Sequence, residues 1–248
     1  MERLYSIKRR LNHIICGMDK IGLLLHRNEV QERKYVFEKL TALGVKKIEE
    51  RGYVKYVYIE LDKDPKTNEY LASVIADLIT SFYKFRVLIS HIKDIKCNIY
   101  EYYSLIGALL STDIEKEKIL IRRSLQNVKM VTPRALIELR LPSLIDNWVS
   151  LCNLASALIP SSPKPREIFE LISYFLADGD NAPRLTITDS DPLSIAINGE
   201  IIKPIPFTDN SDLNLLLTAI REHPSHIVIK NQERLSESLL NTFRALGQ

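Results

Sequence analysis

Cysteines are few in this sequence, and their spacing excludes the usual cysteine-based sites. The 248 residues include three, Cys16, Cys97 and Cys152, with no CxxC pair among them. A cysteine-based zinc site needs closely spaced thiolates, and a disulfide framework needs an even number of cysteines at short spacings. We therefore expect no metal site and no cofactor, and we interpret Cys152 as a small apolar core residue.

Long apolar runs are also missing. Charges interrupt the N-terminal segment MERLYSIKRR where a signal peptide would be apolar. No stretch reaches the roughly 18 uncharged apolar residues that a membrane span requires. The sequence therefore favours a cytoplasmic protein without a membrane span.

Catalytic motifs are absent as well. The sequence has no GxSxG, no HExxH and no carboxylate pair with catalytic spacing. Gly17 and Gly22 have the spacing of a phosphate-binding loop, but Leu23 and Leu24 stand where that loop needs lysine and serine or threonine. We predict no catalytic residue and no enzymatic activity; an enzyme of unrecognised type is an alternative.

The net charge of +3 conceals a gradient along the chain. Residues 1–60 hold 13 lysines and arginines against 8 acidic residues, whereas residues 160–248 hold 8 against 12. Nucleic-acid-binding domains usually have a denser basic stripe. A nucleic-acid-associated protein that uses its basic N-terminal part is therefore the second alternative.

Histidines and tyrosines each have a functional and a structural interpretation. His223 and His226 are close in sequence, but Pro224 prevents the helical spacing of a metal-binding pair, so we interpret His223 as a cation at a helix end. The three tyrosines within residues 100–103 could stack on nucleic-acid bases. Their helical spacing beside apolar residues is more typical of a core or an interface.

Three arginines offer the guanidinium fork that suits a phosphate or a carboxylate of a partner: Arg122, Arg123 and Arg140. The structural interpretation is preferred. In that interpretation these arginines form ion pairs with acids on the same helical surface, namely Glu115, Glu117 or Glu138.

The order of predicted elements indicates an α+β fold with a predominantly helical middle. A small α/β unit occupies residues 1–62, a helical region 63–160, and an α/β unit 161–248, either as separate domains or as one integrated fold. In the first unit, Leu4–Ile7 is a candidate strand. A helix is expected from Asn28, its N-cap, to Gly44, with four residues facing inward: Val30, Phe37, Leu40 and Leu43.

Two further strands are predicted in the first unit. They are Val45–Glu49 and Tyr53–Leu61, joined by a hairpin loop at residues 50–52. The second is apolar and β-branched on both faces, so we expect it to be a central strand.

In the middle region, Asp64-Pro65 opens the longest helix, whose apolar spacing continues to Ile92. Further helices are expected over Ile99–Leu110, from a capping box at residues 112–115, and from Thr132-Pro133, with Pro142 kinking or restarting the last one. Three prolines between residues 160 and 165 end the region.

The last region alternates helices and strands. Asn198-Gly199 between two β-prone runs predicts a two-residue hairpin of type I′. A strand, helix and strand predict one parallel crossover beside that hairpin, in a small mixed sheet. The elements are helix Pro165–Ala177, strand Arg184–Thr188, helix Asp212–Glu222, strand Ile227–Ile229 and helix Leu235–Leu246.

The segment Thr132–Ile159 contains an unusual helix. Leu141, Leu144, Trp148, Cys152 and Ala155 recur at steps of three and four, which is one apolar helix face. The opposite face carries a single charge, so we expect it to be half covered, by the chain or by a partner. Its residues are Ser143, Asp146, Asn147, Ser150, Asn153 and Ser156.

Five segments follow one another in a characteristic order between residues 120 and 245. They are ILIRRSLQN, RALIELRLPSLIDNWVSLCNLASALI, REIFELISYFLADGDNAPRLTI, the Asn198-Gly199 hairpin and LLLTAIREHPSHIVIKNQ. In this order they resemble the YtxC-like family, described as sporulation proteins of spore-forming Firmicutes. The resemblance implies a role in endospore formation and brings no enzymatic activity or cofactor with it.

The sequence thus predicts a sporulation protein of unestablished biochemical activity that acts as a protein-interaction module. Its partner would be another protein or a second copy of the chain. The predicted binding residues are Arg140, Asp146, Asn147, Ser150 and Asn153.

Overall fold

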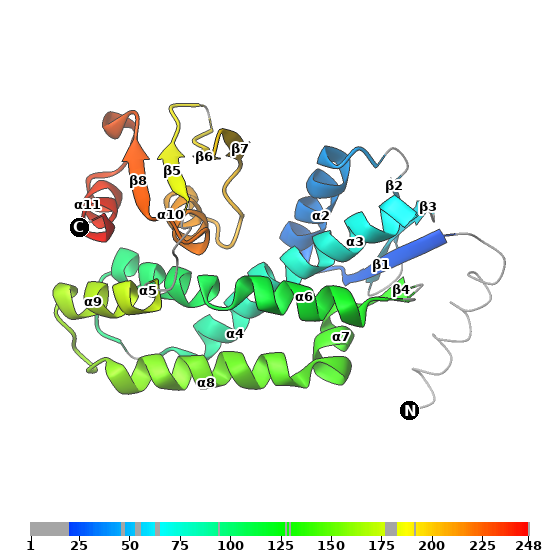
Figure 1. The fold of residues 1–248 in the computed structure, drawn as a ribbon, viewed down its shortest axis with the longest axis horizontal. Helices are drawn as coiled ribbons and strands as arrows, with labels where there is room; N and C mark the ends of the chain where they lie inside the picture. Colours follow the sequence, from blue (N-terminus) through cyan, green and yellow to red (C-terminus); the bar gives the residue numbers. More distant parts are fainter. Residues whose placement is uncertain are drawn as a thin grey trace.

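The structure is a computed structural model, and it describes residues 20–45, 48–52, 56–62, 65–93, 95–126, 128, 130–176, 183–190 and 192–247. The fold is α+β and mainly helical, as predicted. Two four-stranded sheets, both mixed, are connected by a set of long helices (Figure 1). The candidate strand Leu4–Ile7 lies outside the described residues.

The first sheet has the strand order β2-β3-β1-β4. The prediction of a central strand is confirmed, because β3 (Tyr56–Asp62) lies between β2 (Ile48–Gly52) and β1 (Lys20–His26). The predicted hairpin loop at residues 50–52 is wrong. Backbone pairing continues to the end of β2, where Gly52 lies opposite Val57, so residues 50–52 belong to the strand. The short β4 (Met130–Val131) pairs parallel with β1.

Gly22 belongs to a strand and not to a phosphate-binding loop. It lies within β1 opposite Glu60, and the buried ring of Tyr58 covers it so closely that a Cβ at this position would overlap Cε2 of that ring. The glycine is needed here for close approach of an aromatic ring. Residues 17–19 lie outside the described part of the chain.

We expect Gly22→Ala to lower the free energy of unfolding by about 1–3 kcal/mol, because the added methyl group forces the Tyr58 ring out of its place. Urea denaturation followed by circular dichroism measures the change. In a Tyr58→Leu background the same substitution should cost less, because the ring is gone. An equal cost in both backgrounds would refute the contact as the cause.

The helix α2 (Val30–Ala42) differs from its prediction at both ends. Glu29 occupies the N-cap position in place of Asn28, without a capping hydrogen bond. Val30 and Leu43 are exposed instead of inward-facing, because they lie at the extreme ends of the helix, beyond the part that packs on the core. Gly44, with φ of 80°, ends the helix as expected.

The helical middle begins with one continuous run. The helix α3 (Pro65–Leu78) passes through a π-helical turn, η1 (Ile79–Tyr83), into α4 (Lys84–His91). A π turn adds one residue to the helix, shifts the phase of the residues after it and is frequent at functional positions. Directly after this turn, Lys84 lies in the interior with none of its surface exposed.

Five helices follow. A capping box at Asn98 starts α5 (Ile99–Ser111). The capping box predicted at residues 112–115 does not form: Asp113 precedes α6 (Ile114–Ser124) in the left-handed region without a capping bond, and the Thr112 hydroxyl donates to the carbonyl of Ala108 instead. As predicted, Pro142 restarts the chain between two helices. The remaining three are α7 (Pro133–Arg140), α8 (Pro142–Leu158) and α9 (Pro165–Phe175).

The second sheet has the order β7-β6-β5-β8. The predicted hairpin is confirmed, since Asn198 and Gly199 have φ of 50° and 89°, as a type I′ turn requires. The predicted parallel crossover is also present, between β5 and β8. The elements are β5 (Arg184–Ile187), β6 (Ile195–Ile197), β7 (Glu200–Ile202), α10 (Ser211–Arg221), β8 (His226–Ile229), η2 (Gln232–Arg234) and α11 (Glu237–Leu246).

Two hydrophobic cores lie on either side of the helical middle. One is formed with β1, β3, α2 and α3, and the other with the second sheet, α5, α9, α10 and α11. The helix α8 belongs to both, because Leu144 and Trp148 pack in the first core while Cys152 and Ala155 pack in the second. The burial of Cys152 confirms its interpretation as a core residue. The exposed face of α8, opposite these buried residues, therefore lies over the junction of the two cores.

Candidate functional site

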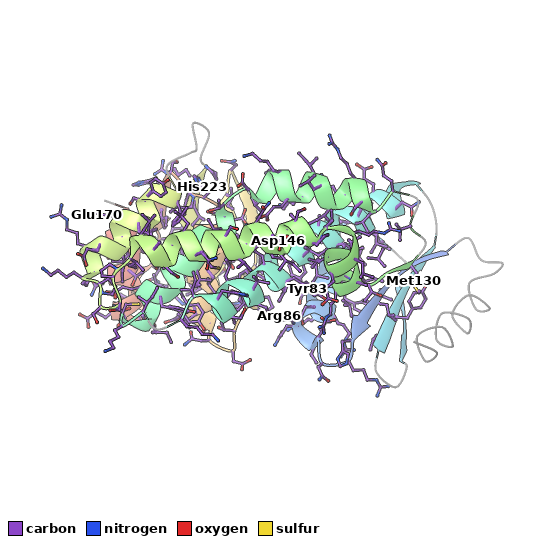
Figure 2. All side chains as sticks on the ribbon, turned by 90° about the horizontal axis from the view of Figure 1, so that it is seen from below. Tyr83, Arg86, Met130, Asp146, Glu170 and His223 are labelled. Carbon is purple, nitrogen blue, oxygen red and sulfur yellow. The ribbon has the colours of Figure 1, made fainter. Side chains whose placement is uncertain are left out.

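The outer face of α8 is open to solvent along its length. Asp146, Asn147, Ser150 and Asn153 are all exposed on this one face, whereas Trp148 on the opposite face is only 1% exposed. Figure 2 looks onto α8 and Asp146, and no other described element crosses in front of the helix there. The expected cover over this face is therefore not supplied by the described part of the chain.

A groove of about 520 Å³ runs along one side of α8, between α8 and α6. Its apolar lining comes from both helices and includes Leu120, Leu151 and Leu154. Two of the predicted binding residues, Asn147 and Ser150, line it as well. Leu120 and Leu154 are exposed by 45% and 44%, an uncommon arrangement for two leucines that face each other across one groove.

A buried ion pair forms the base of this groove. Lys84 donates from Nζ to both carboxylate oxygens of Glu117, at 2.9 and 3.1 Å, and to the carbonyl of Thr112 at 2.6 Å. Trp148 donates from Nε1 to Glu117 Oε1 at 2.7 Å. Each of these three side chains comes from a different helix: α4, α6 and α8. The network therefore fixes the spacing of the two helices that form the groove walls.

Burial lowers the pKa of Lys84, and the attraction of the Glu117 carboxylate acts in the opposite direction. The carboxylate is 8% exposed and the ammonium is not exposed at all. A buried charge of this kind is tolerated only when its partner is in place. The ion pair thus links the position of α6 to that of α4.

The other side of α8 has a smaller hollow, of about 340 Å³, whose polar groups are already engaged. Tyr83 donates to Glu29 Oε1 at 2.7 Å, and the Arg86 guanidinium lies over the Tyr83 ring at 5.3 Å (Figure 2). Burial, followed by the Glu29 charge, raises the pKa of Tyr83 above its usual range. The polar groups on this side are thus paired with one another.

The arginines near the groove do not pair as expected. Glu115 bonds to Lys118, Glu117 to Lys84, and Glu138 to Arg134. Arg122 and Arg123 are exposed, and neither forms an ion pair with a residue that the structure describes. The structural interpretation of these two side chains is therefore wrong, because the local acids already bind lysines or another arginine.

Arg140 lies at the end of α7 and is separate from the exposed face of α8. Its Nη1 donates to the carbonyl of Ser124, the last residue of α6, at 3.1 Å. This contact places Arg140 beside the arginine-bearing end of α6. Of the five predicted binding residues, four thus share the outer face of α8, and Arg140 extends the site toward α6.

The tyrosines have the structural roles that were preferred, and His223 lies at a helix end as predicted. Tyr102 donates to the carbonyl of Ile92 at 2.9 Å, and Tyr103 stacks on Phe85 with ring centroids 6.3 Å apart. Tyr100 is half-buried against the second core. His223 follows the end of α10, where its backbone N–H donates to the carbonyl of Ile220.

No protein-family model, curated protein or solved structure matches the chain. Within the residues that the structure describes, no helix is both long and apolar enough to cross a bilayer.

Sequence reasoning missed the ion pair at the base of the groove. A signal was present for one partner, since Lys84 is spaced four residues before the buried Leu88, on a helix face that is otherwise apolar. Glu117 gave no such signal, because acids and lysines alternate at the start of α6. Only the packing of α6 against α4 distinguishes Glu117 from its neighbours.

Proposed function

We propose that this chain is a protein-interaction module whose groove between α6 and α8 holds an amphipathic helix of a partner protein. One observation carries the proposal: an exposed, nearly uncharged helix face continues into a groove lined by leucines. A helix face that is free in solution normally carries lysine and glutamate. A face without them suits contact with another protein.

The shape of the site favours a helix as the bound element. Two roughly parallel walls, α6 and α8, leave between them a groove with apolar residues at helical spacing, such as Leu151 and Leu154. An amphipathic helix binds such a groove by placing its own i, i+3 and i+4 apolar residues in it. The 17 residues of α8 extend over about 25 Å, enough for several turns of a partner helix.

The charges at one end of the groove specify the partner further. Arg122 and Arg123 at the end of α6 have no described ion-pair partner, and Arg140 lies beside them. Guanidinium groups bind carboxylates through paired hydrogen bonds. We therefore propose that the partner helix has an acidic flank that lies over these arginines.

The setting that we propose is the cytoplasm of a sporulating cell. Its support is the resemblance of residues 120–245 to sporulation proteins. All of α8 lies within the resembling segments, whereas α6 belongs to them only in its last turns. The biochemical part of the proposal does not depend on this setting.

We expect Ser150→Lys and Leu154→Lys each to reduce binding of the partner by at least about tenfold, because each places a charge against the apolar helix. The melting temperature should change by no more than about 2 °C, since both residues are exposed. The measurement compares the amount of partner retained by tagged wild-type and variant protein from sporulating cells, with each melting curve recorded.

A matched control is Ser173→Lys, which changes an exposed serine on α9, far along the chain from the groove. It should retain the partner at the wild-type level. Equal retention by all four proteins would contradict the proposed site. Retention of nucleic acid that weakens with added salt would support the basic N-terminal alternative instead.

A further inference from the structure

A second cavity, of about 430 Å³, lies on a different part of the molecule. It forms where the first core meets the second sheet, because its walls come from α2, α3 and α6 on one side and from the β6-β7 hairpin and the end of α10 on the other. Polar side chains dominate it. They are Tyr35, Lys39, Asp77, Lys118, Glu200, Lys203, Arg221 and Glu222.

Arg221 has an unusual position in this cavity. It is the last residue of α10 and is 95% buried, with a relative exposure of 5%. Its Nη1 donates to Glu222 Oε1 at 2.6 Å. Its Nε and Nη2 are also buried, and neither has a hydrogen-bond partner in the described part of the chain.

The two unpartnered nitrogens lie on the same edge of the guanidinium plane. Their N–H bonds point in nearly parallel directions, and this edge is the one that binds two oxygens of a carboxylate or a phosphate side by side. Leaving buried N–H donors of a charged group unpaired is energetically unfavourable. Such a cost is unusual at a helix end whose other groups are well packed. An oxyanion that accepts from both N–H groups would remove it.

The neighbouring charges favour an anion. Lys203 is exposed and has no ion-pair partner among the described residues, and Lys39 lies over the Tyr35 ring at 5.5 Å. Two of the carboxylates in the walls are already engaged: Asp77 accepts from Lys118 at 3.0 Å, and Glu222 accepts from Arg221. The third, Glu200, is exposed at the edge of the hairpin.

We propose that this cavity binds a small molecule through an oxyanion group, a phosphate or a carboxylate, that the Nε–Nη2 edge of Arg221 holds with Lys203 and Lys39 beside it. Because the walls come from both halves of the fold, the bound molecule would hold the hairpin and α10 against α2 and α6. A ligand that binds only the folded state raises the free energy of unfolding, and the increase grows with ligand concentration. This proposal is independent of the groove and its partner.

The test uses inorganic phosphate and succinate as probes, each titrated into the full chain by calorimetry at constant ionic strength set with sodium chloride. We expect saturable binding of at least one probe. Lys203→Gln should weaken it about threefold and Arg221→Gln at least about tenfold, because a bidentate contact is lost. Lys230→Gln, which removes an exposed lysine outside the cavity, should bind like the wild type.

The outcomes are distinct. Binding of phosphate alone identifies a phosphorylated ligand, and binding of succinate alone identifies a carboxylated one. If Arg221→Gln does not fold, the double variant Lys39→Gln/Lys203→Gln provides the comparison. Absence of saturable binding of both probes, or equal binding by the cavity variants and by Lys230→Gln, would overturn the proposal.

Discussion

Glu117→Gln is expected to lower the free energy of unfolding by about 3–5 kcal/mol. The substitution keeps the size of the side chain and removes its charge, so the ammonium of Lys84, which has no exposed surface, loses its counter-charge. The amide also cannot accept two hydrogen bonds from Lys84 and one from Trp148 as the carboxylate does. Urea denaturation at neutral pH measures the loss.

The control is Glu170→Gln on α9 (Figure 2). The carboxylate of Glu170 forms an exposed ion pair with Arg166 at 2.8 Å. Exposed pairs of this kind contribute only about 0–1 kcal/mol. A loss at Glu117 as small as that at Glu170 would show that Lys84 reaches water in solution. The buried network could then not hold α6 and α8 in place.

The free energy of unfolding of Glu117→Gln is also expected to depend on pH. Burial already lowers the pKa of Lys84, and loss of the Glu117 charge removes the largest influence that opposes it. An unfolded lysine keeps its proton up to about pH 10.4. Between the lowered pKa and that pH, the unfolded state binds more protons than the folded state, so the free energy of unfolding rises with pH.

Glu117→Gln should therefore recover part of its lost stability between neutral pH and about pH 10, relative to Glu170→Gln in the same buffers. The measurement is a series of urea denaturation curves across this range. A constant difference between the two variants would mean that the loss at Glu117 does not come from a buried ammonium.

Trp148→Ala should be the second strongly destabilising change, at about 3–5 kcal/mol. Trp148 is 1% exposed, packs in the first core and donates to Glu117. Its removal leaves a cavity directly beneath the groove and takes a donor from the carboxylate. Circular dichroism must follow unfolding, because the chain has only one tryptophan to serve as a fluorescent probe.

Trp148→Phe separates the two contributions to this effect. Phenylalanine fills most of the space but donates no hydrogen bond, so we expect a loss of about 1–2 kcal/mol. Glu117 then keeps Lys84 as its partner. Equal losses for alanine and phenylalanine would show that packing at this position contributes little.

Much of the fold was predicted from local patterns, because one or two residues, or the spacing within one helix, determine the local structure. Asn198-Gly199 gave the type I′ turn, Pro142 gave the restart between α7 and α8, and the apolar spacing around Trp148 gave the buried face of α8. Each depends on backbone geometry or helical periodicity, which a sequence carries directly. The outward direction of Asp146, Asn147, Ser150 and Asn153 followed from the same periodicity.

Contacts between distant segments were not predictable in this way. The strand β1 was missed because KIGLLLH shows no alternation: Leu23, Leu24 and Leu25 are all buried, in a strand that lies between β3 and β4. Periodicity shows which face of a helix is buried but not which helix covers it. The pairing of Lys84 with Glu117, 33 residues away, and the meeting of Arg221 with α2 depend on that missing information.

The most direct test of the interaction site is photo-cross-linking from position 147. A photoreactive phenylalanine analogue replaces Asn147, which lines the groove, or Glu170, which does not, in protein produced in sporulating cells. We predict one cross-linked protein from position 147, attached through an amphipathic segment with an acidic flank, and none from position 170. Leu154→Lys should abolish the product. The same products from both positions, or none from position 147, would contradict the proposal that this groove is an interaction site.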